Sequence, residues 1–292
     1  MKPAAFDYAR AESADHAVEE LRRHAGDARL LAGGQSLVPM MNLRLARPSV
    51  LIDIGGLPLA AIAAAPGAIE IGALARHRAV LADAAVAAAA PIIPAAVRHV
   101  GHPTVRNLGT AGGSIAYADP TAEMAALLVL LDGEVRTQSA DGSRTIAAED
   151  FFRGAFTTAL GDDEMIVALR FRPPAAPHGS AFVEIAERHG DYAIAAVGVT
   201  IVAEGDTITQ ARIVLSGAEG RPVRARAAES MLQGERPEGE AVRAAAASAV
   251  AGRSSYGDIR ASAEYRRSLL EALTLRAIRQ AGKEAMRCSA SV

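Results

Sequence analysis

Two pairs of adjacent glycines constrain the fold of this chain more than any other feature. The pairs are Gly33-Gly34 and Gly112-Gly113, and polar residues follow each of them. An apolar run over residues 28–31 precedes the first pair, and a helical pattern over 37–45 follows it. Two sharp backbone turns, one of them between a strand and a helix, are therefore expected.

Glycine pairs in this setting favour anion binding. Without a Cβ the backbone can approach a ligand closely, and its N–H groups can point at anionic oxygens. Side chains in the same segments add donors: Gln35, Ser36, Thr110 and Ser114. One pair alone most often marks an ordinary tight turn. Two pairs favour a phosphate-bearing ligand held from two sides.

Other nucleotide-binding motifs are missing from the sequence. No two glycines are separated by a single residue, so the Rossmann G-x-G-x-x-G pattern cannot occur. The G-x-x-x-x-G-K-[ST] loop, G-x-S-x-G and His-Glu-x-x-His are absent as well. No catalytic acid, base or nucleophile is therefore assigned.

The pattern of apolar and polar residues predicts an α+β fold in three parts. Residues 1–55 form a strand–loop–helix–strand unit, residues 56–176 a mixed unit, and residues 177–292 antiparallel strands followed by three helices. The proline-rich segment 173–177 is the best linker candidate. The expected strands are 28–31, 50–54, 68–72, 134–138, 144–147, 164–172, 181–186, 192–203 and 207–215. The expected helices are 13–26, 37–45, 76–90, 91–100, 120–131, 222–233, 238–251 and 262–281.

Composition excludes several classes of function. The net charge is -2 with scattered arginines, which argues against nucleic-acid binding. The single cysteine, Cys288, cannot ligate an iron–sulfur cluster, and the seven histidines show no metal-ligand spacing. The most apolar stretch, 79–97, is rich in alanine and broken by prolines, so no membrane insertion is expected. The first residues lack the apolar core of a signal peptide, and we expect a cytoplasmic protein.

Four further positions are ambiguous from the residues alone. Asp119 and Pro120 suit the N-cap and first position of a helix, with Glu123 in its first turn. The alternative for Glu123, acceptance from ligand hydroxyls, is weaker on this ground. Tyr192 is a candidate stacking surface because aromatic residues make up only 4% of the chain, but simple core packing is the favoured explanation on the residues alone.

Four ordered segments resemble one known family, the FAD-binding medium subunit of molybdenum hydroxylases such as xanthine dehydrogenase and carbon monoxide dehydrogenase. The segments are Leu-Leu-Ala-Gly-Gly-Gln-Ser-Leu-Val-Pro-Met-Met-Asn-Leu-Arg-Leu (30–45) with Leu-Ile-Asp-Ile (51–54), Val-Arg-Asn-Leu-Gly-Thr-Ala-Gly-Gly-Ser-Ile-Ala-Tyr-Ala-Asp-Pro (105–120), Phe-Phe-Arg-Gly (151–154) through Glu164, and Arg-His-Gly-Asp-Tyr-Ala (188–193). The resemblance implies a two-subdomain FAD-binding fold of the vanillyl-alcohol-oxidase (PCMH) type plus a C-terminal α+β domain.

The resemblance also implies which residues hold a non-covalent FAD. Those expected around the pyrophosphate and adjacent groups are Leu31, Ala32, Gly33, Gly34, Gln35, Ser36, Thr110, Ala111, Gly112, Gly113 and Ser114. Glu123 would accept from ribityl or ribose hydroxyls, Ile166 would line the nucleotide pocket, and Tyr192 would cover part of the isoalloxazine ring. The sequence departs from relatives at Ala111, where a larger aliphatic residue is usual, and at Val183 and Glu184, where some relatives carry Lys.

In such complexes the resemblance implies a division of labour. A large subunit binds molybdopterin, a small subunit carries [2Fe–2S] clusters, and the FAD of the medium subunit reduces an external acceptor. A dimer of heterotrimers is implied. A stand-alone FAD-dependent oxidoreductase and a flavin-free assembly subunit are the alternatives. The first would need a base near the flavin, and the intact glycine pairs argue against the second.

Overall fold

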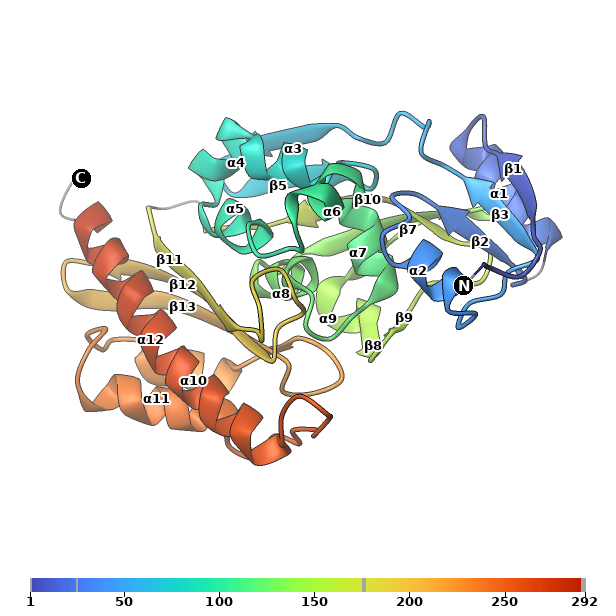
Figure 1. Cartoon of the computed structure of the whole chain (residues 1–292). Helices are drawn as coiled ribbons and strands as arrows, with labels where there is room; N and C mark the ends of the chain where they lie inside the picture. Colours follow the sequence, from blue (N-terminus) through green and yellow to red (C-terminus); the bar gives the residue numbers. More distant parts are fainter. Residues whose placement is uncertain (1, 25, 175–176, 290–292) are drawn as a thin grey trace.

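The computed structural model describes residues 2–24, 26–174 and 177–289, which form three β-sheets with helices around them (Figure 1). The sheet of the N-terminal residues lies at one end of the molecule and the sheet of the C-terminal residues at the other, with the largest sheet between them. Residues 175–176 of the expected linker lie outside the described residues. The α+β class expected from the sequence is confirmed.

The N-terminal sheet is parallel, in the order β1-β3-β2. Its strands are Asp7–Arg10 (β1), Ala28–Leu31 (β2) and Val50–Asp53 (β3), joined by helices Ala14–Arg23 (α1) and Leu37–Asn42 (α2). Ser13 caps α1 as expected, because its side chain accepts a hydrogen bond from His16 N at 3.0 Å. Strand β1 was not expected, since its short polar sequence lacks an apolar pattern.

The central sheet is antiparallel, with β10 in its middle and order β4-β5-β10-β6-β7. Its strands are Ile62–Ala65 (β4), Ala68–Gly72 (β5), Glu134–Ser139 (β6), Gly142–Ala147 (β7) and Met165–Phe171 (β10). The helices around it are His77–Ala82 (α3), Ala84–Ala89 (α4), Ile92–Val97 (α5), Pro103–Leu108 (α6), Ala111–Tyr117 (α7), Glu123–Leu130 (α8) and Ala148–Phe151 (α9). A two-stranded ribbon, Phe152–Gly154 (β8) and Thr157–Thr158 (β9), follows α9.

Helix α8 is the centre of the largest core, and every one of its residues is buried. It begins at Glu123, not at Pro120, and Ala122 occupies the N-cap position. The expected capping by Asp119 is therefore wrong: Asp119 Oδ1 instead accepts from Thr121 N at 2.8 Å and Thr121 Oγ1 at 2.7 Å. Asp119 makes a local turn that places it at the edge of a cleft and not on the helix axis.

The glycine-rich stretch 101–119 is more regular than its composition suggests. It contains helices α6 and α7, separated by Gly109. Pro103 stands at the first position of α6, where a missing N–H costs nothing, and Thr110 caps α7. A second glycine turn was expected here, but Gly112 and Gly113 lie in the first turn of a helix.

The C-terminal sheet is antiparallel, in the order β11-β12-β13-β14, and one of its faces carries three helices. The strands are Gly179–Ile185 (β11), Ala195–Glu204 (β12), Thr207–Ser216 (β13) and Val223–Arg224 (β14). The helices are Arg226–Leu232 (α10), Glu240–Val250 (α11) and Ala263–Ser289 (α12), and α12 crosses the sheet (Figure 1). The other face packs on α8, so this sheet shares the central core.

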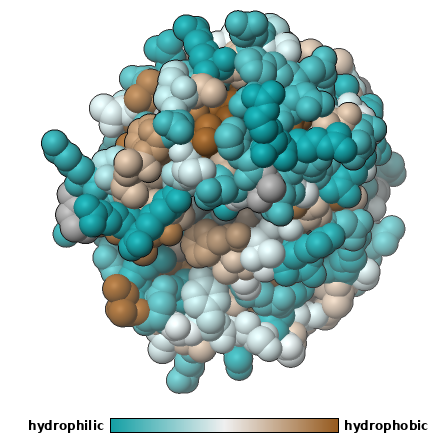
Figure 2. All heavy atoms as spheres, turned by 90° about the vertical axis from the view of Figure 1, so that its right-hand side faces the viewer, coloured by the Kyte–Doolittle hydropathy of each residue, from teal (hydrophilic) through white to brown (hydrophobic). Residues whose placement is uncertain are grey.

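Tyr192 was expected to start a strand but lies in the loop before β12. No helix in the described ranges combines the length and apolarity that crossing a membrane requires. The face shown in Figure 2 is mostly hydrophilic, with hydrophobic atoms in separate patches.

Candidate functional site

A cleft of about 530 Å³ brings both glycine pairs together with the Tyr192 loop. Its walls come from the turn between β2 and α2, from α6 and α7, from the start of α8 and from the loop between β11 and β12. Ten of the residues expected at the site line it: Ala32, Gly33, Gly34, Gln35, Ser36, Thr110, Gly113, Ser114, Glu123 and Tyr192. The other four, Leu31, Ala111, Gly112 and Ile166, are not among the lining residues.

The first glycine pair forms the turn that the sequence predicts. Gly34 has a φ of +70°, a conformation that glycine adopts without strain. Within the described ranges, the backbone N–H groups of residues 33–37 have no protein acceptor, and all five residues line the cleft. Backbone N–H groups without a protein partner are uncommon, and a row of them makes a concave anion site.

The two glycine segments touch directly. A Cβ placed on Gly33 would lie 2.2 Å from Leu108 O, at the end of α6. Only glycine allows this approach, because a real Cβ does not come so close to a carbonyl oxygen. The contact fixes the width of the cleft, since it sets how near the first turn lies to the second segment.

The second glycine pair offers side chains and not backbone N–H groups. Gly112 N donates to Ala73 O at 2.8 Å, and Gly113 N donates to Thr110 Oγ1 at 3.1 Å. The N–H groups on either side of the pair also have backbone acceptors. The expectation of exposed amides is therefore correct for the first segment and wrong for the second. What the second segment presents to the cleft includes the Ser114 side chain.

Glu123 supplies a buried carboxyl to the cleft wall. The pKa of this carboxyl is raised to about 8, chiefly by burial and further by the charges of Glu184 and Asp119, while a backbone hydrogen bond opposes the shift. At neutral pH the group is largely protonated, so it can donate as well as accept a hydrogen bond. It therefore suits a ligand hydroxyl better than a ligand phosphate.

Aromatic side chains from three segments line the cleft: Tyr117, Phe156 and Tyr192. The rings of Tyr117 and Phe156 lie 5.1 Å apart at 57°. Burial and the Asp119 charge raise the pKa of Tyr192 to about 12, and a hydrogen bond with Ser36 opposes this shift. Tyr192 is thus a neutral phenol, with 47% of the residue exposed. These rings suit a flat, partly apolar ligand.

Sequence reasoning missed Tyr117, Phe156 and His77 as lining residues. His77 N donates to Gly109 O at 3.1 Å, which packs the histidine behind the second segment. Burial, together with the charge of Arg106, lowers the pKa of the His77 imidazole to about 4. Rarity of aromatic residues was the one available signal for Tyr117 and Phe156, and nothing in the sequence distinguished His77.

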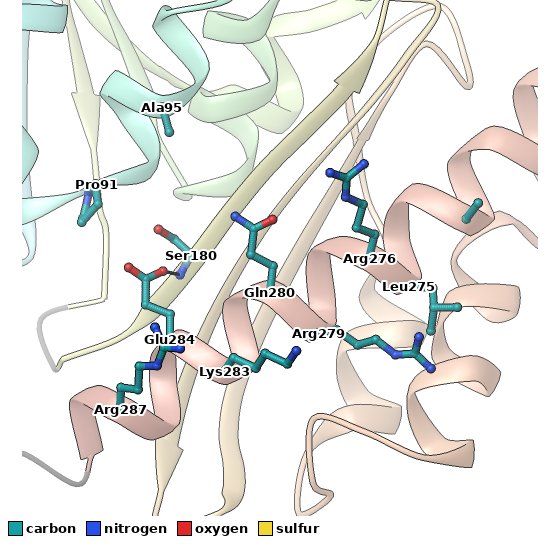
Figure 3. Close-up of a pocket in the computed structure, with 11 residues that line it drawn as sticks. Pro91, Ala95, Ser180, Leu275, Arg276, Arg279, Gln280, Lys283, Glu284 and Arg287 are labelled. Carbon is teal, nitrogen blue, oxygen red and sulfur yellow. Dashed lines mark hydrogen bonds between the residues drawn. The ribbon is translucent and has the colours of Figure 1, made fainter.

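A second hollow, about 860 Å³ and more open, lies between α12, α5 and the start of β11 (Figure 3). Arg276, Arg279 and Lys283 of α12 lie along it, and Glu284 Oε2 accepts from Ser180 N at 2.7 Å. None of its described lining residues is a glycine. The open groove therefore lacks a backbone cradle, and the cleft remains the candidate site.

Comparison of this chain with known protein families identifies the family to which it belongs. Residues 4–174 match the model of the FAD binding domain in molybdopterin dehydrogenase. The chain belongs to this family. Residues 180–281 match the C-terminal domain of the CO dehydrogenase flavoprotein. The fold is thus the two-part FAD-binding fold with an added C-terminal domain.

The similarity to individual proteins extends over the whole length of the chain. The nicotine 6-hydroxylase medium subunit of Paenarthrobacter nicotinovorans is 38% identical, over 97% of this chain and 99% of that protein. The carbon monoxide dehydrogenase medium chain of Hydrogenophaga pseudoflava is 34% identical, over 96% of this chain and 98% of that protein. The chain is a member of a family of oxidoreductase subunits.

Solved structures agree with this assignment. Carbon monoxide dehydrogenase from Hydrogenophaga pseudoflava matches with a TM-score of 0.94 at 35% identity, covering 97% of this chain and 99% of that chain. Quinoline 2-oxidoreductase from Pseudomonas putida 86 matches with a TM-score of 0.93 at 36% identity, covering 98% of this chain and 100% of that chain.

Proposed function

We propose that this chain holds FAD in the cleft and passes electrons from the [2Fe–2S] clusters of a partner subunit to an external acceptor. The observation that carries the proposal is the row of N–H groups at residues 33–37, which line the cleft without a protein acceptor. They fit a pyrophosphate, which offers several anionic oxygens to a concave backbone. When bound, FAD supplies the electron-carrying chemistry, and the chain supplies position and electrostatics.

Each wall of the cleft suits a different part of the cofactor. The turn Ala32–Ser36, with Leu31 behind it, would bind the diphosphate, and Thr110–Ser114 would close on it from the opposite side with hydroxyl groups. Glu123 would exchange hydrogen bonds with ribityl or ribose hydroxyls, because its carboxyl is largely protonated. Tyr192 would cover part of the isoalloxazine ring. We further propose that Ile166, buried on β10, acts as packing beneath the nucleotide.

The same proposal extends to the division of the chain and to its partners. Residues 1–55 and 56–176 would form the two FAD-binding subdomains, and 177–292 the C-terminal domain. A large molybdopterin-binding subunit and a small [2Fe–2S] subunit would complete a heterotrimer, and two heterotrimers would associate. Six large apolar side chains are exposed on or close to the cleft segments, which supports a protein contact there; they are Val38, Leu43, Leu45, Leu108, Phe156 and Tyr192.

Absorbance of the purified chain tests the flavin proposal. We expect a yellow protein that releases FAD on denaturation, or that takes up added FAD. A colourless chain that fails to bind FAD would contradict the proposal. Affinity purification from its native cell tests the partners: a large molybdenum subunit and a small cysteine-rich subunit should co-purify. Turnover of an organic substrate by the isolated chain would instead favour a stand-alone oxidoreductase.

A further inference from the structure

One wall of the cleft is a seam between two loops that are distant in sequence. Val100 and Gly101, between α5 and α6, line the cleft next to Gly190–Tyr192, between β11 and β12. A Cβ on Gly190 would lie 2.8 Å from His102 Cε1 and 3.0 Å from Gly101 C. Gly190 has a φ of +88°, so the contact needs glycine for both its space and its conformation.

The first loop, between α5 and α6, is held by hydrogen bonds from the helix that follows it. Arg106 Nη1 donates to the carbonyl oxygens of Arg98, Val100 and Gly101 at 3.2, 3.0 and 2.7 Å. The second loop, residues 186–194, is held at its end by bonds from Arg260 Nη1 to Tyr192 O at 3.1 Å and from Arg266 Nη1 to Ile194 O. The position of the earlier residues of this loop therefore depends on what joins them to the first loop.

His99 contacts both the second loop, at His189, and the strand that leads into it, at Glu184. His99 Nδ1 lies 3.0 Å from Glu184 Oε1, and the Glu184 side chain is only 5% exposed. The His99 ring also lies 6.2 Å from the ring of His189, within the second loop, and 6.1 Å from that of Phe182 on β11. Glu184 lies on β11, just before the second loop begins, so the pair joins the first loop to the base of the second.

A contribution to folding stability does not by itself explain the His99–Glu184 pair. Glu184 Oε2 is buried and has no hydrogen-bond partner in the described part of the chain. Burying a carboxylate with one oxygen unsatisfied costs free energy, and a buried charged pair is weak evidence for net stabilisation. Such a pair does fix a geometry, because moving the first loop away from β11 would break it and leave a buried polar group unpaired.

We propose that His99 and Glu184 are positioning residues that fix the first loop against the base of the Tyr192 loop and thereby slow the release of FAD. The inference rests on the proposed function, since it assigns to the pair the retention of the ligand of that cleft. Neither residue lines the cleft, so the effect is exerted through the loop and not by contact with the cofactor.

Dissociation of FAD from the loaded full chain tests this inference. We expect His99→Gln and Glu184→Gln each to raise the FAD dissociation rate roughly 10-fold. The double variant should dissociate no faster than the faster single variant, because either change breaks the same pair. His99→Gln is the cleaner of the two, since Glu184→Gln also removes a charge that acts on Glu123.

Glu149→Gln is the matched control. It breaks the 2.7 Å pair of Glu149 with Arg226, which also joins the central and C-terminal parts but includes no cleft residue. This variant should leave the FAD dissociation rate unchanged. A role in stability alone predicts a lower melting temperature with an unaltered rate for His99→Gln, or rate effects that multiply in the double variant, and either result overturns the inference.

Failure of the proposed function, and failure of a variant to fold, can each be distinguished from failure of this inference. A wild-type chain that binds no FAD would count against the proposed function itself. If Glu184→Gln does not fold, His99→Gln and His99→Asn carry the test, because His99 is 31% exposed and tolerates truncation. Flavin fluorescence is a second measurement: it should rise in these variants as the Tyr192 loop opens, and unchanged fluorescence together with an unchanged rate contradicts the proposal.

Discussion

The two glycine pairs look alike in sequence and differ in structure. Gly33-Gly34 turns sharply, and the N–H groups of residues 33–37, which line the cleft, have no protein acceptor within the described ranges, whereas Gly112-Gly113 continues a helix whose first N–H groups are all occupied. In the first segment, glycine allows the turn that leaves backbone N–H groups available. In the second it serves close packing, because a Cβ on Gly112 would lie 2.7 Å from Ala73 Cβ.

The difference shows how the same Gly-Gly motif can serve two different purposes at opposite walls of one cleft. A diphosphate would need many donors, and the backbone N–H groups of one wall would supply them. The opposite wall would then need rigidity more than donors, and the first N–H groups of α7 donate to Ala73 and Ala75, in the segment that follows β5. Identical glycine patterns therefore predict close approach in both places but not what approaches: the Leu108 carbonyl at the end of α6 for Gly33, and Ala73 in the turn after β5 for Gly112.

The largest expected effect comes from the first pair, Gly33-Gly34. Gly33→Val places side-chain carbons where Leu108 O lies 2.2 Å from the Cβ position, so the turn must move away from α6. We expect FAD affinity to fall roughly 100-fold or more, because the donors leave their positions. Titration of the full chain with FAD measures this.

Gly161→Ala is the control for that substitution. Gly161 is outside the cleft, and its added Cβ would meet its nearest neighbour at 3.5 Å, an ordinary contact. FAD affinity should stay within about twofold of the wild type. Comparable losses in both variants would show that the chain responds to glycine replacement in general, and the distinction between the two pairs would fail.

The sequence predicted the first segment well because its signals are local. The strand 28–31, the glycine turn and the following helix depend on residues within a few positions of one another. Helices α6 and α7 were missed, since short helices with glycines have weak propensity and depend on capping and on packing against β5. Tertiary context overrode propensity there.

The composition of the cleft was only partly predictable, for a related reason. Tyr117, Phe156 and His77 reach it from a helix end, a ribbon turn and a helix start that the sequence does not connect. Their proximity is a property of the folded sheets. The resemblance pointed to the segments that we propose bind the cofactor, whereas it could not show which of their N–H groups already have partners.

A second effect, of a few kcal/mol, should appear at Glu123, the first residue of α8, when pH is varied. The pKa of Glu123 is raised from 4.5 to about 8 by burial, so its contribution to stability is present below about pH 4.5 and is lost as pH rises through about 8. Each unit of pH in that window costs about 1.4 kcal/mol at most. Glu123→Gln should therefore gain stability over the wild type as pH increases.

Urea denaturation of the FAD-free chain at several pH values measures the difference. A free-energy difference between the two proteins that stays constant from about pH 4.5 to about pH 8 would show that Glu123 titrates normally. The proposed donor role of this carboxyl at neutral pH would then also fail. Parallel FAD titrations separate the two aspects, since binding should weaken above about pH 8, where Glu123 loses its proton.

A third, smaller effect tests the packing role of the second pair. Gly112→Ala puts a methyl group 2.7 Å from Ala73 Cβ and 2.8 Å from Ala73 O. We expect a loss of about 1–3 kcal/mol in the free energy of unfolding, typical of an overpacked site. Affinity for FAD should fall less than in Gly33→Val. A stable variant that cannot bind FAD would reverse the assignment of the two pairs.

The smallest expected effect concerns the side chains that the second segment presents. Ser114 lines the cleft, and its hydroxyl has no hydrogen-bond partner within the described ranges. Ser114→Ala should weaken FAD binding about 2- to 10-fold, the contribution of one neutral hydrogen bond. Arg276→Ala, in the open groove on α12, is the control and should bind FAD like the wild type. If Ser114→Ala matches that control, the second segment contributes shape alone, and the N–H groups of residues 33–37 must carry the phosphate contacts unaided.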